Sequence, residues 1–426
     1  MNGGRWSTEG HRREQEFVVK IGIVGCGQFS GVFADLWHIH PEVDQVWVTD
    51  VIADRADKLV ERYRFAGTYN SVEEMLASDV DAVCLFTQRW THGPLTVQAL
   101  EAGKHVYAAV PMAVSADEIA AIIEAVQRTG LIYMMGETSY YNPAVIWGRR
   151  EAAKGAFGRL FYAEGDYVHD MDNGFYSAYQ YSGGDDWKAT ASYPPMLYPT
   201  HAVGGVLGAW PTHAVSASCT GVVDDRGDRV FDREVSMFDN DFSNMSALFE
   251  LADGGVMRTN EFRRVGHPNQ GAHESRFRYY GTNGVMEQGT LGATFTTRDT
   301  IADISDQFVT GSGQSDEDAE DALADVDPAL RDSFVSGCAP VHDRTRLPSS
   351  YAGAHNGHEG AHHFLADDFV RAIKHRQHPP LNAWIAARMN LPGIVAFDSA
   401  RRNGERLPIV DHGDCPTPVV DTEQPW

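Results

Sequence analysis

A glycine-rich turn close to the start of the chain constrains the fold more than any other feature. The turn, Gly25–Ser30, follows the apolar run Val18–Val24, which is typical of a strand buried on both faces. It is close to the pattern G-x-G-x-x-G/A, with serine in the third position. The first glycine permits a tight turn, the second lets a pyrophosphate approach the backbone, and the next helix directs free N–H groups at the phosphate. We therefore expect a dinucleotide site that includes Gly25, Gly27, Gln28 and Phe29.

An acidic residue at the end of the next strand supports this interpretation. Asp50 closes the run Val46–Asp50, about twenty-five residues beyond Gly25. A carboxylate at this place accepts the adenosine ribose hydroxyls and repels a 2′-phosphate, which favours NAD over NADP. The alternative is that the glycines serve only a turn.

The first third of the chain alternates short β-rich runs with helical patterns, which predicts a parallel α/β sheet of the Rossmann type. Further strands are expected at 82–86, 105–107 and 131–135. Ser71 and Ser115 each begin an S-x-x-E capping box, which marks the start of a helix. We place an NAD-binding domain at residues 17–141, after a disordered leader at 1–16.

After Asn142-Pro143 the pattern changes to a helix at 143–154 and then to longer strands. Strands are expected at 161–167, 246–251, 256–262 and 276–280 without helices between them, which favours a mostly antiparallel sheet. Helices at 362–375 and 383–390 are expected to return between the domains. The predicted fold is an α/β Rossmann domain followed by an α+β substrate and oligomerisation domain over 142–426.

Composition argues against several classes of partner. The net charge of −24 argues against nucleic acid, because phosphate binding needs clustered lysine and arginine. No run approaches the ~20 consecutive apolar residues of a membrane span. The five scattered cysteines form no C-x-x-C pair, which argues against a zinc site or a disulfide framework and favours a cytoplasmic protein. Acidic residues gather at 311–332, which we interpret as a solvated surface insertion.

Several longer stretches carry a family resemblance. They are Gly22–Gly27, Asp81–Val83, Thr87–His92, Ala99–Val106 and Asn142–Ala144. In these stretches the chain resembles the Gfo/Idh/MocA family of sugar-handling oxidoreductases, over most of Lys20 to Arg401. The resemblance implies an open mixed sheet after the Rossmann domain, a sugar bound between them, and a homodimer or homotetramer formed through that sheet. It also implies cofactor contacts at Thr87, Trp90 and His92.

One departure from the family pattern is informative. The usual dehydrogenases have E-K-P, whose lysine helps to move the proton of the oxidised hydroxyl, where this chain has Ala109-Val110-Pro111. The usual aspartate four residues before His201 is replaced by Leu197. Both changes are expected of one subgroup, the NAD-dependent glycoside hydrolases. The chain is similar to that subgroup at Tyr198–His201, at Tyr167–Asp170, and at Glu137, thirty residues before Tyr167.

This resemblance implies a hydrolysis with no net redox change. NAD takes a hydride from carbon 3 of the sugar, the ketone acidifies carbon 2, the aglycone is eliminated, water adds and the hydride returns. Tyr167 is the candidate for proton transfer at carbon 2, His201 for acid–base work at the hydroxyl or leaving group, and Tyr198 for orientation. Val110 and Glu137 would lie near the nicotinamide.

Each catalytic candidate has a structural alternative. A tyrosine with a pKa of ~10 is a poor base unless a neighbouring cation or the nicotinamide lowers that pKa. Tyr167 could be a core aromatic, His201 could brace the helix that begins near Ala202, and Glu137 could be a surface carboxylate.

Two sugar classes of the subgroup suit the sequence. N-Acetylgalactosaminidases share Y-P-T-H but continue with G-L-G-P, where this chain has Ala202–Gly205. Sulfoquinovosidases need cations for a sulfonate, which Lys188, Arg263 and Arg264 would supply, with His169 as a further substrate contact. The sequence therefore favours a sulfoquinovoside as the small-molecule substrate.

Two other functions stay open: a sugar dehydrogenase that releases NADH, and a non-catalytic protein that senses NAD and sugar. A cluster of His355, His358, His362 and His363 with Glu359 also suggests a metal site. No H-E-x-x-H motif forms there, and hydride chemistry needs no metal. We therefore expect no metal, and we favour hydrogen bonds in the pocket or between the domains.

Overall fold

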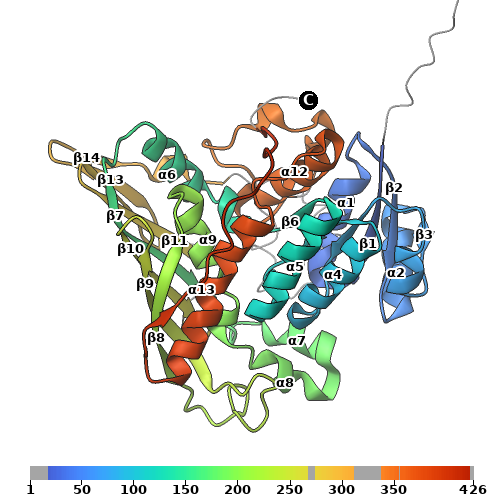
Figure 1. Ribbon diagram of the computed structural model, residues 1–426, viewed down its shortest axis with the longest axis horizontal. Helices are drawn as coiled ribbons and strands as arrows, with labels where there is room; N and C mark the ends of the chain where they lie inside the picture. The colour runs from blue at the N-terminus through green and yellow to red at the C-terminus, as the bar shows by residue number, and fades with distance from the viewer. Residues whose placement is uncertain (1–17, 267–273, 311–336, 355, 423–426) are drawn as a thin grey trace, which may run out of the picture.

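The computed structural model describes residues 18–266, 274–310, 337–354 and 356–422. The predicted leader at 1–16, the acidic insertion at 311–332 and His355 lie outside these residues. Within them the chain forms two sheets of different construction, with helices packed between and around them (Figure 1).

The first sheet is parallel and has the strand order β3-β2-β1-β4-β5-β6 in the described part of the chain. From β1 the chain first adds β2 and β3 on one side, and then β4, β5 and β6 on the other. The strand order therefore reverses between β1 and β4, and open α/β sheets bind ligands at the carboxyl ends of the two strands at such a point. The strands are β1 (Val19–Val24), β2 (Val43–Thr49), β3 (Gly67–Thr68), β4 (Ala82–Leu85), β5 (His105–Ala108) and β6 (Tyr133–Met135). The helices are α1 (Gln28–His38), α2 (Ala53–Tyr63), α3 (Val72–Leu76), α4 (His92–Glu101) and α5 (Ala116–Thr129).

Two of these helices begin at the predicted capping boxes. The hydroxyl of Ser71 accepts a hydrogen bond from the N–H of Glu74, and that of Ser115 accepts one from the N–H of Glu118, both at 3.2 Å. Each serine satisfies an N–H group that the first helical turn leaves without a partner. Both predicted caps are confirmed.

The second sheet is mixed, with the order β14-β13-β12-β11-β7-β10-β9-β8-β15 among the described strands. Strands β7 and β10 run parallel, whereas the other neighbouring pairs run antiparallel. The strands are β7 (Leu160–Val168), β8 (Ala214–Val223), β9 (Phe242–Leu251), β10 (Val256–Phe262), β11 (Ser275–Gly281), β12 (Gly284–Gln288), β13 (Ala293–Thr297), β14 (Ile301–Asp303) and β15 (Leu407–Pro408). The predicted fold class is confirmed by both sheets.

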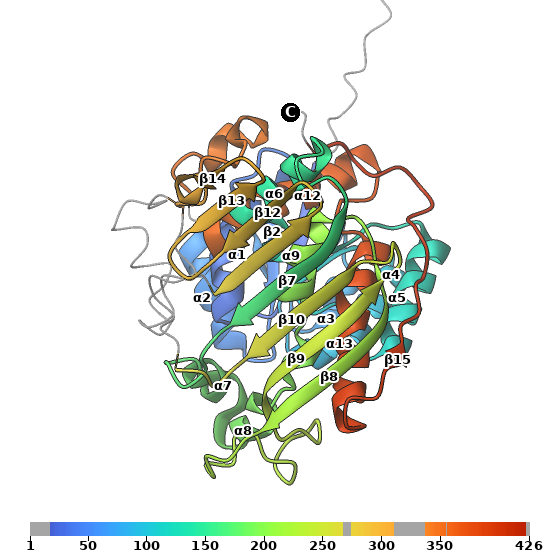
Figure 2. The same cartoon turned by 90° about the vertical axis from the view of Figure 1, so that its left-hand side faces the viewer.

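Helices cover one face of the second sheet. Figure 2 shows the opposite face, across which no helix of the described chain runs. The covering helices include α9 (Thr200–Ala209), against β7 and β11, and α13 (Ala383–Arg401), against β8. The other α-helices of the described ranges are α6 (Pro143–Ala153), α7 (Tyr176–Gly183), α8 (Trp187–Ala191), α9 (Thr200–Ala209), α12 (Ala361–His375) and α13 (Ala383–Arg401).

The last helix is longer than the sequence predicts and joins the two sheets. Helix α13 continues through Pro392 to Arg401, although we expected it to end at Asn390. Proline lacks the N–H for an intrahelical bond and normally ends or bends a helix. Most of α13 is buried, because it packs against α5 and β6 on one side and against α9 and β8 on the other. Packing on two sides therefore outweighs the local cost of the proline.

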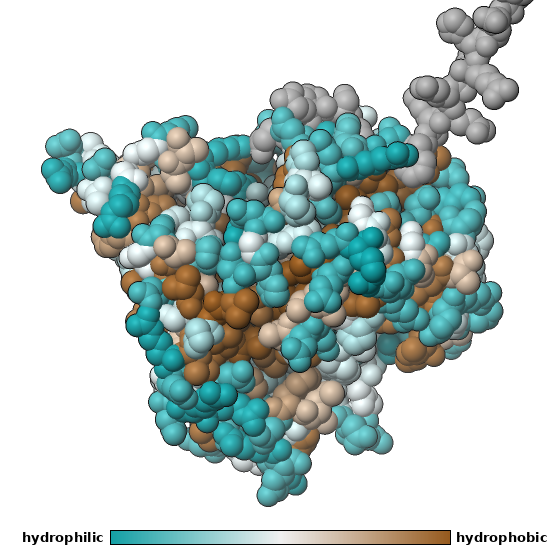
Figure 3. All heavy atoms as spheres, viewed as in Figure 1, coloured by the Kyte–Doolittle hydropathy of each residue, from teal (hydrophilic) through white to brown (hydrophobic). Residues whose placement is uncertain are grey.

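The surface is mixed in character. On the face shown in Figure 3, hydrophobic side chains gather over and around α13, with hydrophilic residues on either side. None of the helices in the described ranges combines the length and the apolar character that crossing a membrane requires.

Candidate cofactor and substrate site

The glycine turn has the backbone shape that its sequence predicts. Gly25 has a φ of +93°, and a Cβ at this residue would lie 2.6 Å from the carbonyl oxygen of Phe86. The backbone after β4 therefore excludes a side chain at Gly25. A Cβ on Gly27 would meet nothing within 4 Å, so the space beside it is open. In the described chain the first turn of α1 has neither an acidic residue nor a side-chain cap, which leaves its N–H groups for a phosphate.

Asp50 fastens this turn. Its carboxylate accepts hydrogen bonds from the N–H of Cys26 at 2.6 Å and from the N–H of Ile52 at 2.8 Å. A carboxylate has further lone pairs, so the same side chain can also accept from a ribose hydroxyl. The role of Asp50 in selecting NAD stays a prediction.

The segment after β4 contains the next predicted cofactor residues. His92 is buried, with Nδ1 2.8 Å from the carbonyl oxygen of Pro111 and Nε2 3.1 Å from that of Thr87. It therefore braces two loops at the carboxyl end of the sheet. Trp90 packs against Phe238, with ring centroids 5.8 Å apart. These contacts position the loop that holds Thr87, while its contact with a cofactor stays a prediction.

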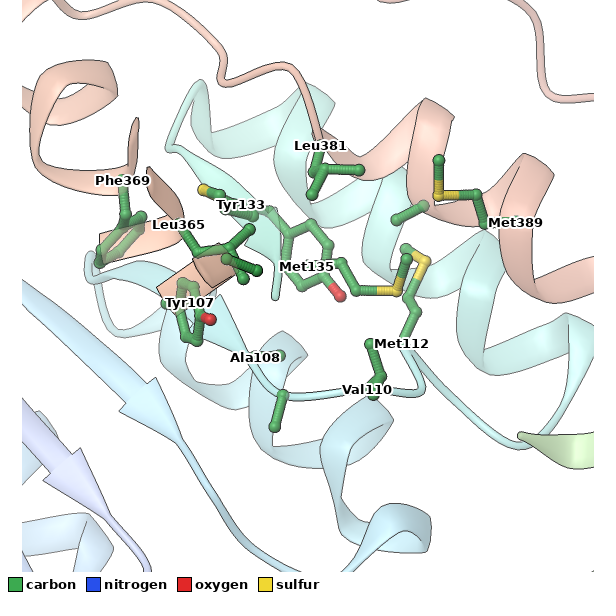
Figure 4. Close-up of a cluster of buried hydrophobic side chains, with 14 of the residues drawn as sticks. Tyr107, Ala108, Val110, Met112, Tyr133, Met135, Leu365, Phe369, Leu381 and Met389 are labelled. Atoms are coloured by element: carbon green, nitrogen blue, oxygen red, sulfur yellow. The ribbon is translucent and has the colours of Figure 1, made fainter. Parts of the chain in front are cut away.

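Val110 supplies no ionisable side chain at the position where the usual dehydrogenases have lysine. It follows β5 and is 7% exposed. Figure 4 shows it with Met112 at the edge of a cluster of buried apolar side chains, to which α12 contributes Leu365 and Phe369. The proton transfer for which the usual family dehydrogenases use lysine therefore has no counterpart at Val110.

The three predicted catalytic residues lie together. The ring centroid of His201 is 4.6 Å from that of Tyr167 and 5.1 Å from that of Tyr198. Tyr167 is near the end of β7, and His201 is in the first turn of α9, which packs on β7. The packing of this helix on the sheet therefore brings together residues that are 34 positions apart in the chain.

Glu137 is a buried partner of His201. Its Oε1 lies 2.8 Å from Nδ1 of His201 and accepts a hydrogen bond from the N–H of Ser139 at 2.7 Å. Burial by itself raises the pKa of Glu137, but the attraction of His201 and the hydrogen bonds outweigh it, so that the pKa lies below its usual value. An ionised Glu137 favours a proton on Nδ1 of His201 and leaves Nε2 to exchange a proton with a ligand.

Tyr167 is paired with His169. Its hydroxyl lies 2.7 Å from Nδ1 of His169, and the same nitrogen is 3.4 Å from Oε2 of Glu274. Burial and the charge of Glu274 raise the pKa of Tyr167 well above its usual value, although Arg263 acts in the opposite direction. Burial also lowers the pKa of His169 well below its usual value. The expected nearby cation is therefore present, but it does not make Tyr167 acidic.

That cation is one half of a buried pair. The guanidinium of Arg263 lies 4.7 Å from the centroid of the Tyr167 ring and donates to Oε2 of Glu261 at 2.8 Å. Glu261 is opposite Tyr167 in the β7–β10 register and is fully buried. Burial raises the pKa of Glu261 to about 8, against the attraction of Arg263. We had not predicted Glu261, but its E-x-R spacing is the signal, because alternate residues of a strand share a face.

Arg264 and Lys188 are engaged elsewhere. Arg264 points away from its neighbour and binds Asp224 at 2.7 Å and Asp228 at 2.6 Å. Lys188 donates to the carbonyl oxygen of Asp228 at 2.9 Å. Neither of these predicted substrate residues lines the cavity beside Tyr167. Consecutive residues of an extended chain face opposite sides, which separates Arg264 from Arg263.

A cavity opens beside the catalytic candidates. Of the predicted residues it is lined by Tyr167, His169, Tyr198 and Arg263. Its other walls were not predicted, and they are Arg89, Met171, Phe175, Tyr179 and Tyr193. Phe175 and Tyr179 are four residues apart, as in one face of a helix, and Arg89 lies within the conspicuous stretch Thr87–His92. The cavity thus joins aromatic walls to two guanidinium groups.

His358 of the histidine cluster lies between Phe29, beside the glycine turn, and His201. Nδ1 of His358 is 2.7 Å from Nε2 of His362, and the rings of His358 and Phe29 are 5.7 Å apart. Burial lowers the pKa of His358 to about 3. Among the residues that the structure describes, no group of three or more histidine, cysteine or acidic side chains could hold a metal ion.

Comparison with known proteins finds matches in the N-terminal part. Residues 19–137 match the GFO_IDH_MocA family, described as an oxidoreductase family with an NAD-binding Rossmann fold. A glycosyl hydrolase family 109 protein of Bacteroides fragilis is 34% identical over 132 residues, which are 30% of this chain and 31% of that protein. An alpha-N-acetylgalactosaminidase of Shewanella oneidensis is 29% identical over 203 residues, which are 44% of this chain and 43% of that protein. The match therefore spans less than half the length of either relative.

Solved structures share the whole architecture. A levoglucosan dehydrogenase in complex with NADH and levoglucosan has a TM-score of 0.67 and 15% identity, over 92% of this chain and 99% of that one. A scyllo-inositol dehydrogenase of Lactobacillus casei with bound NAD(H) and scyllo-inositol has a TM-score of 0.63 and 13% identity, over 92% and 99% of the two chains. At these identities the likeness establishes the fold alone.

Proposed function

We propose that this chain, whose residues 19–137 match the Gfo/Idh/MocA family of NAD-binding oxidoreductases, is an NAD-dependent glycoside hydrolase with no net redox change. One observation carries the proposal: the rings of Tyr167 and His201 are in contact and Glu137 is bound to His201, while Val110 stands where a dehydrogenase has its lysine. The names of the glycosidase relatives support the same class of reaction.

The residues of the first sheet fit a dinucleotide. The open space beside Gly27 and the N–H groups of α1 suit a pyrophosphate, and the turn that Gly25 makes is held by Asp50. Bound NAD would supply a hydride acceptor that returns the hydride at the end of each cycle. Thr87, Trp90 and His92 would border it, with Gln28 and Phe29 at the start of α1.

The residues of the second sheet would move protons. Nε2 of His201 would exchange a proton with a sugar hydroxyl or the leaving oxygen, while Glu137 holds Nδ1. The oxygen of Tyr167 would act on the hydrogen at carbon 2 once its own proton has passed to Nδ1 of His169, 2.7 Å away. Burial raises the pKa of Tyr167 and lowers that of His169, so both shifts oppose this transfer, which would need the positive charge of the nicotinamide to lower the pKa of Tyr167. Tyr198 would orient the sugar against both.

The sugar class is a narrower part of the proposal. Sulfoquinovosides stay our first candidate for the substrate. Of the three predicted sulfonate-binding residues, Arg263 lines the cavity, whereas Lys188 and Arg264 do not. N-Acetylgalactosaminides are the second candidate, supported by the alpha-N-acetylgalactosaminidase relatives.

One assay separates the hydrolase from its rivals. Purified protein is incubated with chromogenic glycosides with and without NAD, and both aglycone and NADH are followed. Aglycone release that needs NAD but accumulates no NADH supports the proposal, and deuterium from the solvent should enter carbon 2 of the product. Stoichiometric NADH would instead make the protein a sugar dehydrogenase. Binding without either product would make it a sensor.

The uncovered face of the second sheet is the proposed oligomer interface. Leu248 on this face is 51% exposed, and the ion pairs of Glu164 with Arg258 and Arg278 lie in the same row of the sheet. A homodimer or homotetramer would bury this face. Light scattering of the wild type and of Leu248→Glu tests it, since a charge at a buried contact should shift the mass to that of the monomer.

A further inference from the structure

We infer that Arg89 forms a subsite for an acidic substituent of the sugar, a carboxylate or a sulfonate. The inference rests on the proposed function, because it assigns the ligand of the same cavity. Nine described residues line that cavity, and they include two arginines and no carboxylate. An acidic ligand would balance the charge of these walls.

The two arginines differ in their partners. Arg263 is paired with Glu261 at 2.8 Å. Among the described residues no carboxylate lies within 4.0 Å of Arg89, which donates a hydrogen bond to the hydroxyl of Tyr179 at 2.9 Å. A partly buried cation without a counter-ion is costly to maintain. Arg89 is therefore the wall residue whose charge a ligand would satisfy.

A cage of tyrosines fixes the guanidinium in place. Its central carbon lies 4.7 Å from the ring centroid of Tyr198, 5.0 Å from that of Tyr193 and 5.5 Å from that of Tyr179. Aromatic rings attract the charge of a guanidinium without using its N–H groups, one of which donates to the hydroxyl of Tyr179 here. A guanidinium has five such donors in a fork that matches carboxylate and sulfonate oxygens.

The sugar is a better occupant than the cofactor phosphates. The pyrophosphate already has the open space beside Gly27 and the N–H groups of α1. Arg89 lines the same cavity as Tyr167 and Tyr198, which are the proposed catalytic residues. An acidic group bound by Arg89 would therefore belong to the molecule on which these residues act.

Direct binding tests the subsite without requiring turnover. The ligands are both anomers of the methyl glycosides of glucose, glucuronic acid and 6-deoxy-6-sulfoglucose, titrated calorimetrically into NAD-loaded protein. The wild type should bind one of the acidic sugars at least tenfold more tightly than glucoside. Arg89→Gln should lose roughly 10- to 100-fold for the acidic sugar and less than about twofold for glucoside, because a hydrogen-bonded charge contributes on this scale. Comparison of the glucuronic acid glycosides with the 6-deoxy-6-sulfoglucose glycosides shows whether the subsite prefers a carboxylate or a sulfonate.

Control variants isolate the charge. Arg89→Lys should retain part of the preference. Arg401→Gln should retain all of it, since Arg401 lies over Phe397 at 5.6 Å and pairs with Asp239 outside the cavity. Equal wild-type affinity for acidic and neutral sugars would overturn the inference, even if Arg89→Gln does not fold. So would an Arg89→Gln variant that loses NAD affinity but keeps the sugar preference.

The outcomes also separate the subsite from the hydrolase. If an acidic glycoside binds in an Arg89-dependent way but no aglycone is released, the subsite is supported and the proposed hydrolase activity is contradicted. If NAD-dependent aglycone release is equally fast from neutral and acidic glycosides and does not change in Arg89→Gln, the hydrolase activity is supported and the subsite is contradicted.

Discussion

The two sides of the site are built from different parts of the chain. On the side of the first sheet, the expected ligand contacts are backbone groups, namely the turn at Gly25 and Gly27 and the N–H groups of α1. On the side of the second sheet they are buried side chains linked to one another, such as Glu137 with His201 and Glu261 with Arg263. A backbone site depends on the absence of a Cβ, whereas a linked side-chain site depends on protonation. The two sides should therefore respond to different perturbations.

The largest effect is expected at the side-chain site. His201→Ala should lower NAD-dependent aglycone release by roughly 10²- to 10⁴-fold, because it removes the proposed acid–base group. NAD affinity, measured by calorimetry, should change less than about twofold. His213→Ala is the control, since His213 lies 3.8 Å from Asp411 outside the cavity. A His201→Ala enzyme with wild-type turnover would move the acid–base role to another residue.

The buried acid of the same side should make stability depend on pH. Folding raises the pKa of Glu261 from 4.5 to about 8. Its contribution to stability is therefore complete below about pH 4.5 and is lost as the pH rises through about 8. The unfolding free energy of the wild type relative to Glu261→Gln should fall by a few kcal/mol between pH 5 and 8.5, at no more than about 1.4 kcal/mol per pH unit.

Urea unfolding of both proteins at the two pH values checks this. All other titrating groups are shared, so that their contributions cancel in the difference. Glu124 is exposed, so the unfolding free energy of the wild type relative to Glu124→Gln should not fall with pH in this way. A difference that is constant with pH would mean that Glu261 is ionised throughout as the partner of Arg263.

Two alanine substitutions separate strain from ligand contact on the backbone side. Gly25→Ala should cost about 1–3 kcal/mol of unfolding free energy, because its φ is +93° and its Cβ would meet the Phe86 carbonyl. Gly27→Ala meets nothing in the protein and should unfold almost like the wild type, yet bind NAD at least about tenfold more weakly. Unchanged NAD binding in Gly27→Ala would show that the pyrophosphate lies elsewhere.

The smallest effect is expected away from both sides. Ser115→Ala removes the cap of α5 and should cost about 1 kcal/mol in thermal or urea unfolding. NAD affinity and aglycone release should not change, because Ser115 belongs to neither side of the site. A loss of activity larger than the loss of stability would imply that α5 positions catalytic groups.

The backbone side could be predicted from sequence because its signals are local. A buried strand, two glycines and an acidic residue follow one another within about thirty positions, and each has one structural meaning. The capping boxes at Ser71 and Ser115 are equally local. The end of α13 was missed because Pro392 is a local signal that packing on two sides outweighs.

The side-chain side could be predicted only in part. Tyr167, His201 and Glu137 came from motif resemblance, whereas Glu261 and Arg89 depend on the register of β7 against β10 and on how the loop after β4 meets the second sheet. The choice between Arg263 and Arg264 depends on a single residue of register. The E-x-R spacing places Glu261 and Arg263 on one face of the strand, but no pattern in the sequence gives the register of β10 against β7.

Helix α13 has a thermodynamic consequence, because it packs on both sheets. Neither sheet can lose it and keep its own core covered, so that the two halves should melt together. A ligand that binds only the folded chain then stabilises every part of it, by about 2.7 kcal/mol at a hundredfold excess over its dissociation constant. NAD held at the glycine turn would thus protect the distant strands of the second sheet from unfolding, and the supply of cofactor would regulate how long the protein persists.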